Sequence, residues 1–511
     1  MAARAKTGSK LLQLPLFLLI FGVASVAMYF PAIFAVTVDD HHSARSFFYA
    51  GTLGLIGVTI VALALGGRKP RYGDLGQLMA LLATFAVLPL FLAVPVQDAI
   101  RTTSFLNAYF DMVSAVTTTG ADVFGNPARL PEAVHLWRAM VGWLGGLLMW
   151  VAASAVLAPL SLGGFEVTAR GIPGRSVAGH MSDGKMDPRF RLARVLRTLG
   201  PVYVGLTAVM WLSLFLAGDR SLVALCHAMS VMATSGISPV GGIENGASSI
   251  PGEGIMFLFL AFGLSRLTFS SDTAVAGGDK LYRDPEFRIG VLFVVGVPLM
   301  LFLRHWIAAL DVDAGEDFQT GLRALWGATF TVLSFLTTTG FVSAEWQSAH
   351  DWSGLSTPGI ILLGLAVMGG GVATTAGGVK LLRVYALYLA GLREMERLVH
   401  PSSVSSTRSG AGRIQRGGAF IAWVFFMLFA LSLTLTVVCF AATGASFEDS
   451  IVLAVAALST TGPLTSAGAE TPIDLMAMGN GAKIIFCAAM VVGRLETLAI
   501  IALLSTDSWR R

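Results

Sequence analysis

Four short segments of the chain combine hydroxyl-bearing side chains with a central glycine, and they resemble one another closely. They are SAVTTTGADVFG from Ser114, SVMATSGISPVG from Ser230, SFLTTTGFVSAE from Ser334 and AALSTTGPLTSA from Ala456. Their central glycines are Gly120, Gly236, Gly340 and Gly462, which lie 116, 104 and 122 residues apart. Glycine can adopt positive φ and turn successive carbonyls to one side, and converging carbonyls can replace the hydration shell of a cation. The chemistry predicted for these segments is cation coordination by backbone oxygen.

We place the four candidate filter segments at residues 116–121, 233–238, 336–341 and 458–463. The residues expected to contact the cation are Thr118, Thr119, Gly120, Thr234, Ser235, Gly236, Thr338, Thr339, Gly340, Thr460, Thr461 and Gly462. The alternative is that these are ordinary re-entrant turns. One such turn is usually structural, but four copies at equivalent positions favour a shared function.

A second glycine-rich stretch, MGGGVATTAGGVK, follows the third candidate filter segment and interrupts an apolar run. It lacks the Gly-Lys-Ser/Thr ending of a phosphate loop and no strand precedes it, which argues against nucleotide binding. We interpret residues 369–380 as a candidate gating loop that obstructs a permeation path. The alternative is close helix packing through small residues. The loop residues expected to act in gating are Gly369, Gly370, Gly371, Thr374, Thr375, Gly377, Gly378 and Lys380.

Arg494 lies inside the apolar run IIFCAAMVVGRLETLAII. An arginine at mid-membrane costs at least ~2.5–3.5 kcal/mol, so it is expected to face the protein interior with a partner. Carbonyls of the candidate gating loop are better candidates than Glu496, which points elsewhere on a helix. A snorkelling arginine near a helix end is the alternative. Lys380 either tunes the inner mouth or only reflects the excess of basic residues on the inner side.

Two titratable residues precede the candidate filter segments. Asp111 either forms hydrogen bonds behind its filter or adds negative field to the pore, and the sequence leaves both open. His227 is interpreted as a packing residue, because lone histidines in apolar surroundings usually are. The three cysteines, Cys226, Cys439 and Cys487, lie far apart in apolar segments and indicate neither a zinc site nor a disulfide framework.

The elements that must position these residues are membrane helices. The 511 residues are 55% hydrophobic and only 13% charged, with a mean hydropathy of +0.72, and apolar runs long enough to span a bilayer recur along the chain. Each candidate filter segment follows a half-helix of about twelve residues. The half-helices are predicted at residues 103–113, 221–231, 323–333 and 447–457. Non-helical backbone survives at membrane depth only where it is buried in protein or lines a cavity.

The predicted fold is therefore all-α and polytopic, with four pseudo-symmetric helix–pore loop–helix repeats around one central pore. Two further transmembrane helices, at residues 11–36 and 50–66, come first, within residues 1–70. The four repeats are expected at residues 71–165, 190–282, 286–400 and 415–511. The first run is too long for a signal peptide, so we expect it to be retained.

Basic residues are sorted by side. If both termini are cytoplasmic, 26 of the 35 Lys and Arg lie on the inner side, as the positive-inside rule expects. Carboxylates gather on the outer side, where they would concentrate cations.

The four filter segments, GGGVATTAGGVKLLRV from Gly369, REMERLVHP from Arg393 and GRLETL from Gly493 together resemble the Trk/Ktr/HKT superfamily of K⁺ transporters, most closely its TrkH type. The resemblance covers nearly the whole chain. It implies selective K⁺ uptake across the bacterial inner membrane, a homodimer, and a cytoplasmic TrkA-type regulatory ring that binds NAD(H) and ATP. It also implies that Arg494 lies beneath the filter and helps to hold the gate shut. Gly120 favours K⁺ over Na⁺ by the same resemblance. Two segments depart from the family pattern: Ser235 replaces the usual glycine in the second, and the fourth has threonines where Asn or Met are common.

We expect a channel-like K⁺ uptake protein rather than an enzyme, because no Ser/His/Asp or metal-ligand constellation is found on the helices. Bound cofactors are expected only on the regulatory partner. The rival hypotheses are a Na⁺-permeable or weakly selective cation pathway and a K⁺/H⁺ symporter. Residues 164–194 and 402–418, rich in Gly, Ser and Arg, are predicted to dock the regulatory ring.

Overall fold

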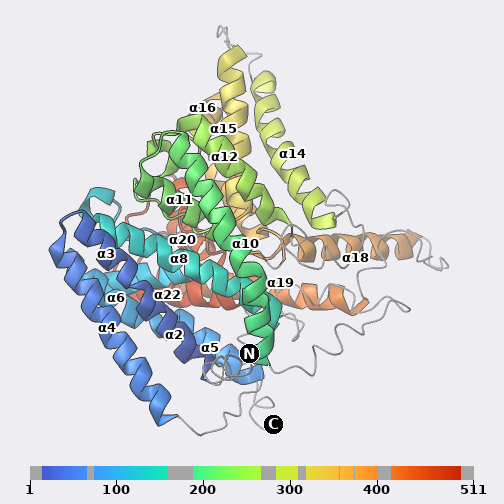
Figure 1. Ribbon diagram of the computed structural model, residues 1–511. Helices are drawn as coiled ribbons and strands as arrows, with labels where there is room; N and C mark the ends of the chain where they lie inside the picture. Colours follow the sequence, from blue (N-terminus) through green and yellow to red (C-terminus); the bar gives the residue numbers. More distant parts are fainter. Residues whose placement is uncertain are drawn as a thin grey trace.

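The computed structural model describes residues 14–65, 74–157, 188–265, 284–308, 318–355, 357–372, 374–399 and 416–496. Within these ranges every regular element is a helix (Figure 1). Seven of the described helical stretches are long and apolar enough to cross a membrane. The prediction of an all-α, multi-pass membrane protein is thereby confirmed. Most of the two predicted docking segments, apart from residues 188–194 and 416–418, and most of the basic stretches used to assign sidedness lie outside the described residues.

Two spans precede the first repeat. The first consists of α2 (Leu16–Ala27) and α3 (Tyr29–Thr37), and the second is α4 (His41–Ala64). The second span begins at His41 rather than at the predicted Ala50, because Asp40 caps it: the Asp40 carboxylate accepts a hydrogen bond from the Ser43 N–H at 3.1 Å. Such a cap satisfies one of the backbone donors that a helix start leaves unpaired.

The first repeat contains one broken span, one short helix and one long helix. Its first span is α5 (Asp74–Ala86) followed by α6 (Leu88–Ile100). The short helix α7 (Phe105–Val116) leads into the first candidate filter segment. The chain then returns through α8 (Glu132–Ala152), which ends in the π-helical turn η2 (Ala153–Leu157).

The other three repeats follow the same order. The second contains α10 (Pro188–Leu216), α11 (Ser221–Ala233), α12 (Ser249–Leu260) and the 3₁₀ turn η4 (Ala261–Leu264). The third contains α14 (Pro285–Ala308), α15 (Phe318–Leu336), α16 (Trp346–Ser353), α17 (Gly359–Met368) and α18 (Leu381–Val399). The fourth contains α19 (Arg416–Ala442), α20 (Phe447–Leu458), α21 (Leu464–Ala467) and α22 (Asn480–Leu495).

Three of the four short helices have the predicted length, and one does not. The helix α15 runs for 19 residues and begins at Phe318 rather than near Arg323. Its added first turn includes Gln319 and Thr320, both exposed, so the apolar pattern that marked the half-helix in the sequence does not extend to it. In Figure 1, α15 accordingly reaches farther from the centre of the molecule than α11 or α20.

The short helices are packed by their own repeat and by the preceding one. Each contacts the first span of its own repeat, in the pairs α6 with α7, α10 with α11, α14 with α15 and α19 with α20. Each also contacts a helix that follows the candidate filter segment in the repeat before it, in the pairs α8 with α11, α12 with α15, α17 with α20 and α22 with α7. The last pair joins the fourth repeat to the first. The four repeats therefore form a closed ring, in the order of the sequence.

Candidate cation site and adjoining loop

Each of the four short helices ends in the same hydrogen-bonded turn. In the first repeat the Thr118 N–H donates to Ala115 O at 2.9 Å and the Thr119 N–H donates to Ser114 O at 2.8 Å. This pair of bonds is a Schellman cap, whose residue just past the helix adopts the left-handed conformation. The residues in this position are Thr118, Thr234, Thr338 and Thr460, with φ of 55°, 49°, 59° and 54°.

A left-handed β-branched residue is a backbone outlier, and strain of this kind costs about 1–3 kcal/mol per residue. Glycine usually occupies this position, yet the chain has threonine there in all four repeats. All four threonines are buried. Strain that recurs at one position in four copies indicates that the carbonyl directions and the hydroxyl groups at this point matter more than local stability.

The four candidate filter segments lie against one another. A Cβ added at Gly120 would meet the carbonyl oxygen of Ser235, and one added at Gly236 would meet that of Thr339. In the same way Gly340 lies against Pro463, and Gly462 lies against Ala121. Each segment thus contacts the next, and the fourth contacts the first. Since no side chain fits at Gly120, where φ is also positive at 69°, glycine is required there by both space and conformation.

The fourth candidate filter segment departs from the other three. Gly120, Gly236 and Gly340 have positive φ, whereas Gly462 does not. The Gly462 N–H donates to Thr119 O of the first segment at 2.6 Å. Pro463 then begins the turn that leads into α21. The ring of segments is therefore fourfold in connectivity but not in backbone conformation.

Ser235, which stands where glycine is usual in the family, directs its side chain toward its own short helix. Its Oγ lies 3.1 Å from Ser230 Oγ, on the short helix of its own repeat. Its carbonyl oxygen is the atom next to Gly120. Although serine stands where glycine is usual, the backbone carbonyl oxygen at this position still faces the neighbouring segment of the ring.

Two of the four left-handed threonines form hydrogen bonds with the candidate gating loop. Thr338 Oγ1 accepts a hydrogen bond from the Gly377 N–H at 2.7 Å, and the Thr234 hydroxyl donates to Thr375 Oγ1 at 3.1 Å. The hydroxyls of Thr118 and Thr460 have no hydrogen-bond partner among the described residues. The loop therefore lies directly against the second and third candidate filter segments, and Gly377 also packs against Ser459 and Thr460 of the fourth.

The candidate gating loop folds back on itself between α17 and α18. The Val379 and Lys380 N–H groups donate to the carbonyls of Val367 and Met368, both at 2.9 Å. The Leu381 N–H donates to Gly370 O at 3.1 Å, and Gly378 packs against Gly369. These bonds bring the two ends of the loop together, so its middle part projects toward the filter segments.

The loop is also attached to neighbouring helices. The Gly371 N–H donates to Gly263 O at 3.1 Å, and the Thr374 hydroxyl donates to Gly371 O at 2.7 Å. The Val372 N–H donates to the Glu286 carboxylate of α14 at 3.1 Å. The second and third repeats therefore hold one side of the loop.

Arg494 of α22 holds the other side. Its Nη1 donates to Thr375 O at 2.6 Å, so a loop carbonyl is the partner of this arginine. Its Nε and Nη2 have no hydrogen-bond partner among the described residues. Lys380 donates to Ala376 O within the loop. Both cations are buried and line a small pocket beneath the loop together with Glu496 and Gly493.

Glu496 pairs with a residue that the sequence analysis did not single out. Arg383 of α18 donates from Nη2 to Glu496 Oε2 at 2.7 Å, and both side chains are buried. The Arg383 guanidinium also lies over the Phe425 ring, 3.6 Å from its centroid. This ion pair joins the end of the loop to the end of α22.

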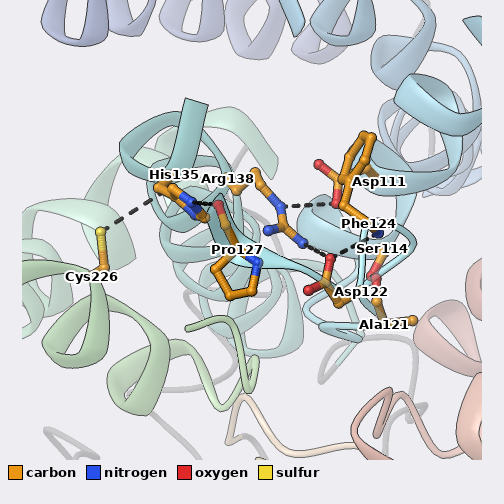
Figure 2. A network of polar contacts seen from close by, with 9 residues as sticks. All are labelled: Asp111, Ser114, Ala121, Asp122, Phe124, Pro127, His135, Arg138 and Cys226. Atoms are coloured by element: carbon orange, nitrogen blue, oxygen red, sulfur yellow. Dashed lines mark hydrogen bonds and ion pairs between the residues drawn. The ribbon is translucent and has the colours of Figure 1, made fainter. Parts of the chain in front are cut away.

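Asp111 and His227 occupy equivalent positions behind the first two filter segments. Asp111 Oδ1 accepts a hydrogen bond from Arg138 Nε at 2.9 Å, so of the two sequence hypotheses the structure places this side chain in a network behind the filter (Figure 2). His227 is fully buried, with Nε2 2.9 Å from Ser238 Oγ. It is a hydrogen-bonded packing residue, as expected.

Several buried charges were not singled out from the sequence, among them Arg138, Glu253, Glu286 and Arg383. Their common signal is a charged residue within or beside an apolar run, the signal that identified Arg494. Among the described residues no cluster of His, Cys, Asp and Glu has the arrangement of a metal site. Cys226 and Cys487 are buried, Cys439 is partly exposed, and all three are free thiols.

Comparison with known proteins agrees with this architecture. The family model described as "TrkH: Cation transport protein" matches residues 256–510. The chain is 32% identical over 407 residues to the Trk system potassium uptake protein TrkH of Salmonella typhimurium, covering 79% of each chain. It is 31% identical over 435 residues to the protein of the same name from Halomonas elongata, covering 84% of each.

The crystal structure of the potassium transporter TrkH from Vibrio parahaemolyticus is similar over 98% of this chain and 99% of that chain, with a TM-score of 0.81 and 25% identity. The fold and these likenesses define a multi-pass membrane transport protein built from pore-loop repeats. The chain belongs to the TrkH family.

Proposed function

We propose that this protein takes up K⁺ across the bacterial cytoplasmic membrane through a single pore at the centre of the four repeats. The observation that carries the proposal is the closed ring of four equivalent segments, each entered through a strained threonine and each touching the next. The four short helices end at this ring, so their C-terminal partial negative charges favour a cation there. The backbone oxygens of residues 118–120 and their equivalents would replace the hydration shell of K⁺.

The candidate gating loop closes the inner side of this filter in our proposal. Its contacts with Thr234, Thr338 and Arg494 support this role, because they attach the loop to filter segments and to the fourth repeat at once. Arg494 adds a positive charge beneath the filter that repels the permeating ion. Opening requires these hydrogen bonds to break, so a regulator must supply the free energy that they contribute to the closed state.

The relatives are named as Trk system potassium uptake proteins, and from this we infer the wider assembly. We propose a homodimer in the inner membrane, with both termini cytoplasmic and a TrkA-type nucleotide-binding ring docked on the cytoplasmic face. NAD(H) and ATP would bind to that ring, and this chain would carry only the transported ion.

The rival functions are a weakly selective cation pathway and a K⁺/H⁺ symporter. The orientation of Ser235 supports K⁺ selectivity, since its hydroxyl is turned toward Ser230 and its carbonyl toward Gly120. A symporter needs a carboxylate that can exchange protons along the path. Asp111 is a poor candidate for that role, because Arg138 holds it in a buried ion pair behind the filter.

Purified protein in liposomes, assayed for K⁺ and Na⁺ uptake, separates these functions. We expect K⁺ uptake well above Na⁺ uptake, and flux driven only by a pH gradient would instead indicate a symporter. Gly120→Ser should lower the K⁺/Na⁺ ratio at least tenfold, because the added side chain meets the Ser235 carbonyl. The matched control is Gly125→Ser: φ is also positive there, at 62°, but nothing lies within 4 Å of an added Cβ. An unchanged ratio in Gly120→Ser would refute the filter assignment.

A further inference from the structure

A buried ion-pair network lies behind the first candidate filter segment (Figure 2). Arg138 of α8 donates from Nε to Asp111 Oδ1 at 2.9 Å and from Nη2 to Asp122 Oδ1 at 2.8 Å. Asp111 belongs to the short helix that enters the segment, whereas Asp122 follows Gly120 by two residues. One guanidinium therefore joins the chain on both sides of the filter segment.

Two further hydrogen bonds tighten this connection. The Ser114 hydroxyl donates to Ala121 O at 3.0 Å, and the Phe124 N–H donates to Asp122 Oδ1 at 3.1 Å. Arg138 and Asp111 are only 4% and 1% exposed. A buried ion pair is strongly unfavourable to break, because the remaining charge has no solvent to replace its partner. The first filter segment is thus fixed at both ends.

A different buried charge makes the equivalent connection in the third repeat. Glu253 of α12 is 2% exposed and accepts a hydrogen bond from Trp326 Nε1 of α15 at 2.8 Å. It also accepts from the Ser343 hydroxyl and the Ala344 N–H, both at 2.7 Å. Trp326 precedes the third filter segment and Ser343 follows it. One carboxylate therefore holds both ends of this segment.

The second and fourth repeats have neutral residues in place of the two aspartates of the first repeat. The positions equivalent to Asp111 and Asp122 are His227 and Ser238 in the second repeat, which lie within hydrogen-bonding distance of each other. In the fourth repeat they are Leu453 and Leu464, both buried. The charged connections therefore stand behind the first and third segments, which are opposite each other in the ring. Each carries a formal net charge of −1, from two aspartates and an arginine in one case and from a lone glutamate in the other.

We propose that Arg138 and Glu253 are positioning residues for ion selection, which fix the first and third filter segments on opposite sides of the pore. The proposal rests on the proposed function of the ring as a cation filter. A segment held at both ends cannot move inward to coordinate a smaller ion, so K⁺ is favoured over Na⁺. The two equal negative charges would add to the attraction for a cation without either side chain touching it.

The test is K⁺ and Na⁺ uptake by the full-length protein in liposomes, measured for Arg138→Gln and Glu253→Gln. We expect each variant to retain K⁺ uptake and to lower the K⁺/Na⁺ ratio at least fivefold. Arg138→Lys, which keeps the charge but loses the two-pronged geometry, should give an intermediate ratio. Because Arg138 and Asp122 act as one unit, Asp122→Asn should add little to the effect of Arg138→Gln.

The matched control is Arg220→Gln. Arg220 forms a similar ion pair with Glu132 of α8 at 2.9 Å, but its side chain is 75% exposed. It precedes α11, whose opposite end leads into the second filter segment, so the ratio should stay at the wild-type value. An unchanged ratio in both Arg138→Gln and Glu253→Gln overturns the proposal, and so does an equal fall in uptake of both ions.

Should neither neutral variant fold, Arg138→Lys and Glu253→Asp decide the question. A lowered K⁺/Na⁺ ratio is then expected, and an unchanged ratio contradicts the proposal. If the wild-type protein itself does not prefer K⁺, the proposed function fails and this inference fails with it. A selective wild type with selective variants overturns only the inference.

Discussion

Replacing Arg494 by alanine tests the gating role of the loop most sharply. The substitution removes the hydrogen bond from the guanidinium to Thr375 O, which is 2.6 Å long and buried. A hydrogen bond from a charged group contributes about 1.5–3 kcal/mol. Since 1.4 kcal/mol corresponds to a tenfold change in an equilibrium constant, the loop should open about 10 to 100 times more readily. In the proposed gate, removal of the positive charge beside the loop acts in the same direction.

The assay is Rb⁺ influx into liposomes that contain the purified protein without any regulatory partner. The expected result is a basal influx at least about tenfold above wild type. Its upper limit is the influx through the fully open protein. Lys483→Gln is the matched control, because Lys483 is a buried cation on the same helix but donates to Asn107 and Met476 rather than to the loop. Its influx should not rise. An unchanged or lower influx in folded Arg494→Ala would refute a blocking role for Arg494.

Two further predictions concern the loop and the helix caps. Thr338→Val leaves the buried Gly377 N–H without its acceptor, which costs the closed loop about 1–3 kcal/mol and should raise basal Rb⁺ influx. Thr118→Val should not, because the Thr118 hydroxyl has no partner among the described residues, and equal influx in the two variants would contradict the proposed contact. Asp40→Ala removes the cap of α4 and should destabilise the protein by about 0.5–2 kcal/mol. A lower melting temperature with an unchanged K⁺/Na⁺ ratio is expected, whereas a changed ratio would mean that α4 affects the filter.

The sequence could predict the features that repeat or that depend on a single run of residues. Four copies of a Thr/Ser-Gly segment were enough to locate the turns and to indicate that they converge, because irregular backbone in a membrane must be buried together. The half-helices before them were indicated by short amphipathic or apolar stretches that are too short to cross a membrane. The start of α15 at Phe318 escaped prediction, since its first turn is polar and exposed.

For an isolated charge, the sequence could predict the type of partner but not which residue it would be. An arginine in an apolar run must find a partner, which pointed to loop carbonyls for Arg494. The pairing of Arg383 with Glu496 joins residues 113 apart in the sequence, and no local pattern specifies such a contact. The roles of Arg138 and Glu253 depend likewise on which helices become neighbours.

Which departure from the family pattern matters more also could not be judged from the sequence alone. In the sequence Ser235 is the residue that most weakens a filter interpretation. In the structure its side chain turns back to Ser230, and the fourth segment is the one whose backbone differs. Pro463 accompanies that difference: its ring holds its own φ at about −65° and restricts the conformation of the preceding residue, Gly462, and a helical turn starts directly after Gly462.

The most direct test of the account is the position of the ion itself. Crystals or cryo-EM samples prepared in K⁺, and then in Rb⁺ for anomalous scattering, should contain density on the axis enclosed by Gly120, Gly236, Gly340 and Gly462. The account predicts a peak coordinated by backbone oxygens of all four segments, which is lost when Na⁺ replaces K⁺. Density for the ion elsewhere, or equal occupancy by Na⁺, would contradict the assignment of these segments as a K⁺ filter.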